Sequence, residues 1–360
     1  MGWGIVGHPR AVDLLRRGIA HDRVSHAYLF SGPPKVGKRT LALEFARSLN
    51  CERLDASGSP PDRPPLPPPN LGGVEGGDPR RSADPCNGCR HCRLIAEGKH
   101  PEVRVIGVQP PHRVVRVADV ESIQSDAALR PADVRRKVYI LEQAELLHPD
   151  AANRLLKTIE EPPEHVVMVL TTSDAEATLP TIVSRCQQVR LRALPRPELA
   201  HYLVETRGLA RERAELLAAL GEGRVGWALE ALADERRLER RTRLLDELAG
   251  LVDADRMERL QYARSLADRW SGHPETVRET LEAWLRWWRD VLLLQRRVEG
   301  IVNLDRRDEL EVQAARLPAA AVAAALASAR DTLLMLDQNV NARLALDIAA
   351  LDLPRSERAA

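Results

Sequence analysis

Short apolar runs separated by helical segments dominate the first half of the chain. Residues 138–141 and 166–170 are uninterrupted apolar stretches with the length of buried strands, and residues 27–30 form another. Between the first two runs, apolar residues at helical spacing predict a helix that ends before Pro162 and Pro163, since proline lacks the N–H that a continuing helix needs. This pattern predicts an α/β domain with a parallel sheet.

The pattern becomes helical throughout beyond Pro195 and Pro197. Trp284, Trp287 and Trp288 fall on one helical stripe there, which is typical of a helix core or a subunit interface. A chain of 360 residues has room for two or three compact units. We therefore expect an α/β domain followed by all-α regions.

A glycine-rich loop follows the earliest of these strands. Gly32, Gly37 and Lys38 match the pattern G-x-x-x-x-G-K, in which loop N–H groups face phosphate oxygens and the lysine reaches the outer phosphates. The residue after the lysine is Arg39, where a hydroxyl would reach Mg²⁺, and Thr40 comes one position later. The loop predicts either a nucleotide site or a vestigial loop that kept its backbone shape for packing.

Glu142 and Gln143 follow the strand at 138–141. In P-loop nucleoside triphosphatases an Asp at such a strand end holds Mg²⁺, and in the AAA+ branch a Glu beside it polarises the attacking water. An amide accepts no proton at neutral pH, so Gln143 cannot activate water. The sequence predicts a nucleotide-hydrolase fold that does not hydrolyse.

Four cysteines have the number and spacing of a closed tetrahedral zinc site: Cys51, Cys86, Cys89 and Cys92. Residues 54–85, rich in Pro and Gly, separate the first from the rest and are expected to be disordered. Loop closure costs grow only logarithmically with length, so Cys51 remains a candidate ligand. His91 is a competing, weaker fourth ligand. Four thiolates leave no open position, so we expect a structural zinc.

Two further polar residues stand near strand ends. Thr172 either senses a phosphate or is a simple strand-terminating hydroxyl. Arg185 carries the planar, permanently charged donors that suit a triphosphate. Taken alone, however, one arginine among so many is an ordinary solvated side chain.

Charge and hydropathy exclude some classes of protein. The net charge is +1, with 53 basic and 52 acidic residues, so no overall attraction to nucleic acid or membranes is expected. The apolar runs look too short to cross a bilayer, and no basic-then-apolar leader opens the chain. We expect a cytoplasmic protein without membrane partners.

Several motifs occur here in one order: residues 7–38, the four cysteines, ANRLLKTIEEPPEH at 152–165 and LPTIVSRC at 179–186. Together they resemble the bacterial DNA polymerase III clamp-loader family of AAA+ proteins, over roughly residues 5–230. Within it the chain resembles the delta-prime branch more than the hydrolysing tau/gamma branch. Arg39, Glu142 and Gln143 replace that branch's metal-binding and catalytic groups, and Gly226 stands where it carries a lid arginine.

The resemblance implies an AAA+ P-loop domain with a zinc module (about 51–92) over residues 1–194, a helical lid over 195–240 and a helical collar over 241–360. It implies a hetero-pentamer with tau/gamma and delta subunits that loads a sliding clamp onto primer–template DNA. Arg185 would be an arginine finger, acting in trans on a neighbour's triphosphate. Gly32, Gly37, Lys38, Thr40 and Thr172 would line this chain's own nucleotide site.

Two other functions stay open. An active hydrolase of the tau/gamma type would use a displaced Thr40 and Glu142 for Mg²⁺. A zinc-ribbon adaptor would bind nucleic acid by itself and keep the P-loop as scaffold, which the near-neutral charge disfavours. Neither intrinsic ATP hydrolysis nor polymerase chemistry is expected of this chain, although it would be a subunit of the polymerase holoenzyme.

Overall fold

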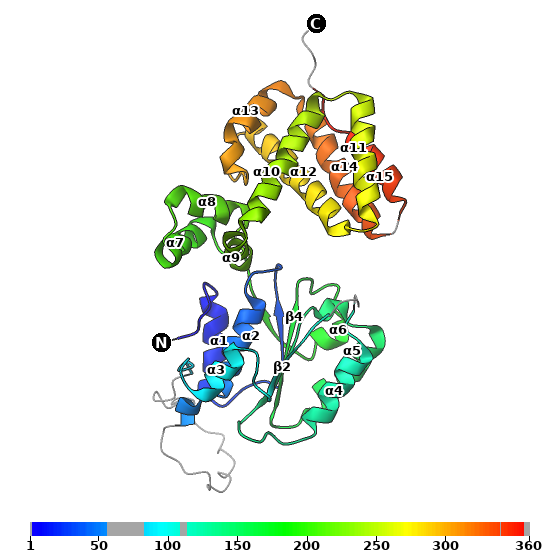
Figure 1. The fold of residues 1–360 in the computed structure, drawn as a ribbon. Helices are drawn as coiled ribbons and strands as arrows, with labels where there is room; N and C mark the ends of the chain where they lie inside the picture. The colour runs from blue at the N-terminus through cyan, green and yellow to red at the C-terminus, as the bar shows by residue number, and fades with distance from the viewer. Residues whose placement is uncertain (1, 56–82, 109–113, 339, 356–360) are drawn as a thin grey trace. The chain divides into compact units, whose positions relative to one another are not determined.

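The computed structural model describes residues 2–55, 83–108, 114–338 and 340–355. Most of the stretch expected to be disordered, 54–85, lies outside them. The chain separates into two compact units: Met1–Leu194 with Arg224–Gly226, and Pro195–Gly223 with Trp227–Ala360 (Figure 1). The first combines a sheet with helices, and the second is helical.

The first unit is built on a five-stranded, all-parallel sheet with the order β2-β3-β4-β1-β5. The strands are β1 (Ala27–Ser31), β2 (Val103–Ile106), β3 (Lys137–Leu141), β4 (Val166–Thr172) and β5 (Gln187–Arg190). β3 and β4 are buried along their whole length, as expected where helices cover both faces of a parallel sheet. The predicted parallel sheet and its three apolar strands are confirmed.

Helices cover the two faces of this sheet (Figure 1). They are α1 (Pro9–Ala20), α2 (Lys38–Leu49), α3 (Arg90–Ala96), α4 (Val117–Ala127), α5 (Pro149–Glu160) and α6 (Pro180–Val183), with 3-10 turns η1 (Glu52–Asp55) and η2 (Ala144–Leu146). Tyr28 and Phe30 pack in the core formed with α1 and α2, whereas Leu29 packs with α4 and α5. Neighbouring strand residues point to opposite faces, so one apolar run supplies both cores.

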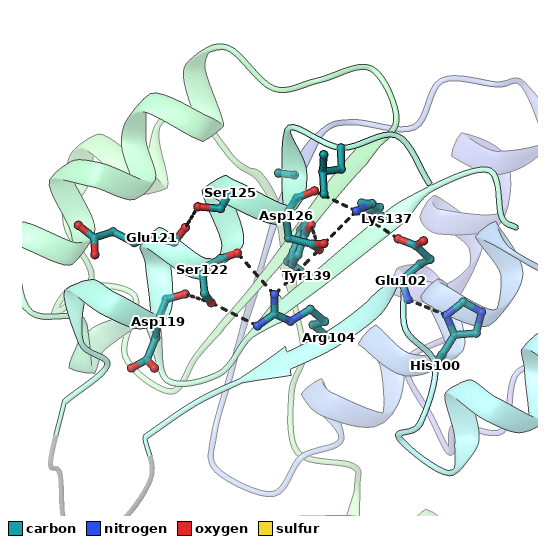
Figure 2. A network of polar contacts seen from close by, with 12 residues as sticks. His100, Glu102, Arg104, Asp119, Glu121, Ser122, Ser125, Asp126, Lys137 and Tyr139 are labelled. Atoms are coloured by element: carbon teal, nitrogen blue, oxygen red, sulfur yellow. Dashed lines mark hydrogen bonds and ion pairs between the residues drawn. The ribbon is translucent and has the colours of Figure 1, made fainter. Parts of the chain in front are cut away.

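A buried lysine ties α4 to the sheet (Figure 2). The Nζ of Lys137, at the start of β3, lies 3.0 Å from Asp126 Oδ1 and 3.3 Å from Glu102 Oε2, and the Tyr139 hydroxyl donates to Asp126 Oδ2. Burial alone would raise the pKa of Asp126, but the bonds from Tyr139 and Lys137 outweigh it and lower that pKa. The carboxylates thus compensate the positive charge of the lysine at a buried position, where an unpaired charge would be costly.

The regular elements in the described residues of the second unit are helices: α7 (Arg196–Arg207), α8 (Arg211–Leu220), most of α9 (Val225–Ala233), α10 (Glu235–Asp253), α11 (Arg256–Trp270), α12 (Pro274–Gln295), η3 (Leu304–Arg306), α13 (Arg307–Arg316), α14 (Ala319–Asp337) and α15 (Ala342–Leu351). Trp284, Trp287 and Trp288 on α12 are almost completely buried in its core. The tryptophan stripe is therefore a helix core. The expected boundary between lid and collar at residue 240 falls inside α10.

One described helix, α14, is long and apolar enough to cross a membrane by length and composition, with a window of mean hydropathy 1.5. This differs from the expectation that no apolar stretch is long enough. It is weak support for a membrane span, because core helices pass the same test. Val322, Ala325 and Ala329 of α14 are buried in the same core as the tryptophans.

Candidate functional site

The glycine-rich loop connects β1 to α2 as a P-loop does. Gly37 is the N-cap of α2 with φ 111°, a backbone conformation that favours glycine. A Cβ on Gly32 would lie 2.2 Å from the carbonyl oxygen of Leu191, so only glycine fits there. Both predicted glycines are therefore required by the loop's shape.

The predicted phosphate-binding lysine lies over this loop. Lys38 Nζ donates to the carbonyl oxygens of Gly32 and Pro33, the latter at 2.8 Å. Burial lowers the pKa of Lys38, and the negative charge of Glu145 acts in the opposite direction. In this structure the ammonium uses loop carbonyl oxygens as acceptors.

The residues at the two metal-holding positions contact each other. Arg39 Nη1 lies 3.4 Å from Glu142 Oε2, although the residues are 103 positions apart. They meet because α2 starts beside the edge where the parallel strands end, and Glu142 directly follows β3. Thr40 is exposed on the next position of α2.

Gln143, where the sequence predicts the loss of a general base, directly follows Glu142. It is exposed and adopts a left-handed conformation with φ 57° as the N-cap of η2. Its side chain is an amide and supplies no general base. Glu145 follows in the same turn, and its Oε1 accepts hydrogen bonds from the backbone and hydroxyl of Ser173.

Thr172 is completely buried at the end of β4. Its hydroxyl donates to the Asp174 carbonyl oxygen at 2.7 Å and accepts from Thr178 Oγ1 at 3.0 Å. Its own carbonyl oxygen accepts from the N–H of Gly32 at 3.2 Å. The side chain thus has the contacts of a strand-terminating hydroxyl, and the backbone supports the P-loop; phosphate sensing by Thr172 stays a prediction.

Gly226 also reaches the P-loop. Its N–H donates to the carbonyl oxygen of Lys35 at 2.9 Å, and a Cβ there would lie 2.7 Å from that oxygen. A residue with a side chain therefore cannot occupy this position without moving the loop. At the position where the resemblance places a lid arginine in the tau/gamma branch, Gly226 makes a close backbone contact with Lys35 instead.

Arg185 lies on the surface between α6 and β5, with 42% of its side chain exposed. Its Nε is 2.7 Å from Glu160 Oε1, and its Nη1 donates to the Thr181 carbonyl oxygen at 3.1 Å. The guanidinium is held at the last turn of α5 and remains open to solvent. The guanidinium is paired with the Glu160 carboxylate, and it remains accessible to another molecule.

The four predicted cysteines come together. Their Sγ atoms lie within 4.8 Å of one another, and those of Cys86 and Cys92 are 4.0 Å apart. Tetrahedral zinc with Zn–S bonds of about 2.3 Å requires Sγ separations of about 3.8 Å, so the set fits the ion. Cys51, Cys86, Cys89 and Cys92 would hold a structural zinc, and no other ligand is needed.

The chemistry of the thiols agrees with this fit. Burial opposes ionisation of Cys86, but the N–H groups of Gly88 and Cys89 lower its pKa to about 6. Burial raises the pKa of Cys51 and of Cys92, which also lie beside other thiols. A cation at the centre would remove the cost of ionising them together.

His91 is engaged elsewhere. Its Nδ1 lies 2.9 Å from Nε2 of His100, and its Nε2 lies 3.6 Å from Glu52 Oε1. Because His100 Nδ1 accepts from the N–H of Glu102, His100 Nε2 donates to His91 Nδ1. His91 Nδ1 thus has a hydrogen-bond partner outside the cysteine cluster, and Cys51 is the fourth member of that cluster.

Three side chains at these sites were not identified from the sequence. Glu160 pairs with Arg185, Glu145 acts on Lys38, and His100 pairs with His91. Glu160 lies within the motif at 152–165, which was the only available signal for it. The effect of Glu145 on Lys38 and the pairing of His100 with His91 had no signal in the sequence, because both depend on how separate elements pack.

Comparisons with known proteins agree with these features. The family described as "DNA polymerase III, delta subunit" matches residues 7–62 and 77–195. The chain is 31% identical to subunit delta' of Bacillus subtilis over 66% of this chain and 63% of that protein. It is 35% identical to subunit tau of Escherichia coli over 64% of this chain and 32% of that protein.

A solved structure, that of a DNA polymerase III gamma subunit-related protein from Thermotoga maritima, aligns with 94% of this chain and 97% of its own chain. The two are 19% identical, with a TM-score of 0.42. The chain spans less than two thirds of the tau and delta' relatives described above. The matched region contains the P-loop, the cysteine cluster and the segment with Arg185. The chain belongs to the family of DNA polymerase III clamp-loader subunits, which includes both delta' and tau.

Proposed function

We propose that this chain is a delta-prime-type subunit, which hydrolyses no ATP itself and supplies Arg185 in trans to the nucleotide of a neighbouring subunit. The observation that carries the proposal is the contrast between two sites. Gln143 and the Arg39–Glu142 pair replace the hydrolytic groups, whereas Arg185 is solvent-accessible on the surface. An arginine at a neighbour's triphosphate stabilises the charge that develops during phosphoryl transfer.

The assembly follows from the same proposal. The chain would join tau/gamma and delta subunits in a hetero-pentamer that places a sliding clamp on primer–template DNA in the cytoplasm. The AAA+ domain would cover residues 1–194, with a lid over 195–240 and a collar over 241–360 that holds the subunits together. Zinc would stabilise the module formed by the cysteine cluster.

Arg185→Ala tests the role of the guanidinium. An arginine finger contributes about 10³–10⁵-fold to turnover at the site it serves. We therefore expect the reconstituted assembly to lose the ATP turnover of the one site that Arg185 serves. Arg190→Ala, an exposed arginine at the end of β5, should leave turnover unchanged. Equal turnover by wild type and Arg185→Ala in an assembly of normal composition would refute the finger.

A hydrolysing subunit of the tau/gamma type is the second candidate, because the identity to tau is as high as that to delta'. It would use Thr40 and Glu142 for Mg²⁺. A single-turnover assay on the pure chain separates the two candidates. The delta-prime proposal expects no hydrolysis above background, and clear hydrolysis by the pure chain would favour tau/gamma.

A further inference from the structure

Arg39 and Glu142 occupy the two positions from which P-loop proteins hold Mg²⁺, namely the residue after the loop lysine and the acid after the neighbouring strand. The structure brings these side chains together, with Arg39 Nη1 3.4 Å from Glu142 Oε2. A positive side chain is therefore bonded to the carboxylate that would otherwise bind the cation.

This arrangement does not fit Mg²⁺. The ion requires oxygen ligands at about 2.0–2.1 Å in near-octahedral geometry. A guanidinium has five donors and no acceptor, so Arg39 supplies no ligand and repels a cation. Thr40 does not replace it, because one residue along a helix turns the side chain by about 100°, and Thr40 is exposed.

Carboxylates act on both cationic side chains at the start of α2. Arg39 pairs with Glu142, and the charge of Glu145 acts on Lys38. Gly107, at the end of β2, leaves the space that Glu142 occupies, since a Cβ there would lie 3.3 Å from the Cβ of Glu142. Two cationic side chains thus stand at the start of α2 with their compensating carboxylates already in place.

We propose that this P-loop takes the phosphates of a nucleoside di- or triphosphate as the metal-free anion, with the guanidinium of Arg39 in the place of Mg²⁺. Arg39 has donors left for phosphate oxygens after it bonds Glu142, and its planar fork suits them. The loop N–H groups and Lys38 bind the remaining oxygens. The inference goes beyond the proposed function, which assigns no ligand to this chain's own P-loop.

Equilibrium titration of the full chain with a fluorescent N-methylanthraniloyl derivative of ADP, in Mg²⁺ and in EDTA, tests this. We expect the wild-type Kd to differ by less than about twofold between the two buffers, whereas Arg39→Ser combined with Glu142→Asp should bind at least about tenfold tighter in Mg²⁺ than in EDTA. Arg39→Lys is the matched control and should stay insensitive to Mg²⁺, because an ammonium also repels the cation.

Two results would overturn the proposal: wild-type binding that tightens about tenfold in Mg²⁺, or no binding by the wild type in either buffer. The side chain of Arg39 is 61% exposed, so its replacement should leave the fold intact, which a thermal melt verifies. Failure here leaves the trans role of Arg185 untouched, because that role is measured by turnover at a neighbouring subunit's site.

Discussion

Arg185 Nε lies 2.7 Å from Glu160 Oε1, so the surface arginine is held by the last turn of α5. Both side chains are nearly half exposed, at 42% and 46%. A pair this exposed adds little to stability and exchanges easily for another anion. The contact thus orients the guanidinium while leaving it accessible at the surface.

Glu160→Gln should separate orientation from chemistry. We expect the free energy of unfolding to change by less than about 1 kcal/mol, since exposed ion pairs contribute little. ATP turnover by the assembly should stay within about twofold of wild type, because the guanidinium proposed to act on the triphosphate is retained. Turnover as low as that of Arg185→Ala would mean that the carboxylate itself is essential.

Cys92→Ser should remove the metal. The purified wild-type chain is expected to contain about one zinc per molecule and the variant almost none, because a structural site needs all four thiolates. Metal analysis measures the zinc content of the wild type and the variant, and thermal unfolding compares their stability.

Cys186→Ala is the matched control for the metal. Burial raises the pKa of Cys186 to about 12, so this thiol stays protonated and it lies outside the cluster. The control should keep its zinc. Full zinc content in Cys92→Ser would contradict the four-thiolate site.

Gly226→Ala should destabilise the first unit by about 1–3 kcal/mol, the usual cost of forcing an atom into a packed site. The added Cβ would lie 2.7 Å from the Lys35 carbonyl oxygen. Gly250→Ala, at an exposed position of α10 with nothing within 4 Å of the added Cβ, should instead stabilise by about 0.5–1 kcal/mol. Denaturant unfolding of both variants gives the sign of each change in the free energy of unfolding. Equal changes would show that the contact with the P-loop is unimportant.

Asp290 gives the second unit a pH dependence. Its side chain is fully buried on α12, where Oδ2 accepts from the N–H groups of Val302 and Asn303 at 2.8 Å. Burial raises the pKa of Asp290 above the usual 3.8, although these bonds oppose the shift. The carboxyl therefore favours folding most below pH 3.8 and loses this contribution as pH rises through the folded-state pKa.

Asp290→Asn removes that ionisation. The stability of wild type relative to this variant should fall as pH is raised from acid to neutral, as followed by urea unfolding with tryptophan fluorescence. Asp290→Ala should be about 1–3 kcal/mol less stable than Asp290→Asn at every pH, since neither side chain ionises and only alanine leaves the buried donors without an acceptor. A wild type that gains stability over Asp290→Asn with rising pH would reverse the sign and reject the shift.

Much of the fold could be predicted from local patterns. The apolar runs at β1, β3 and β4, the helix that ends before Pro162 and the glycine loop all have periods or residue types that restrict the backbone by themselves. The overlapping C-x-x-C pairs likewise indicated a metal site, because few other chemistries use that spacing. The apolar length of α14 was underestimated, since alanine-rich stretches lack the large side chains that mark an obvious run.

The sequence alone determined the strand, loop and helix elements, the loss of a general base at Gln143 and the ligand types at the cysteines. Only the tertiary structure decided which distant side chains meet: Arg39 with Glu142, Arg185 with Glu160 and Gly226 with the P-loop. The physical reason is one of range. Backbone propensity acts between neighbours, whereas a contact between residues far apart exists only once packed elements fix both ends within a few ångströms.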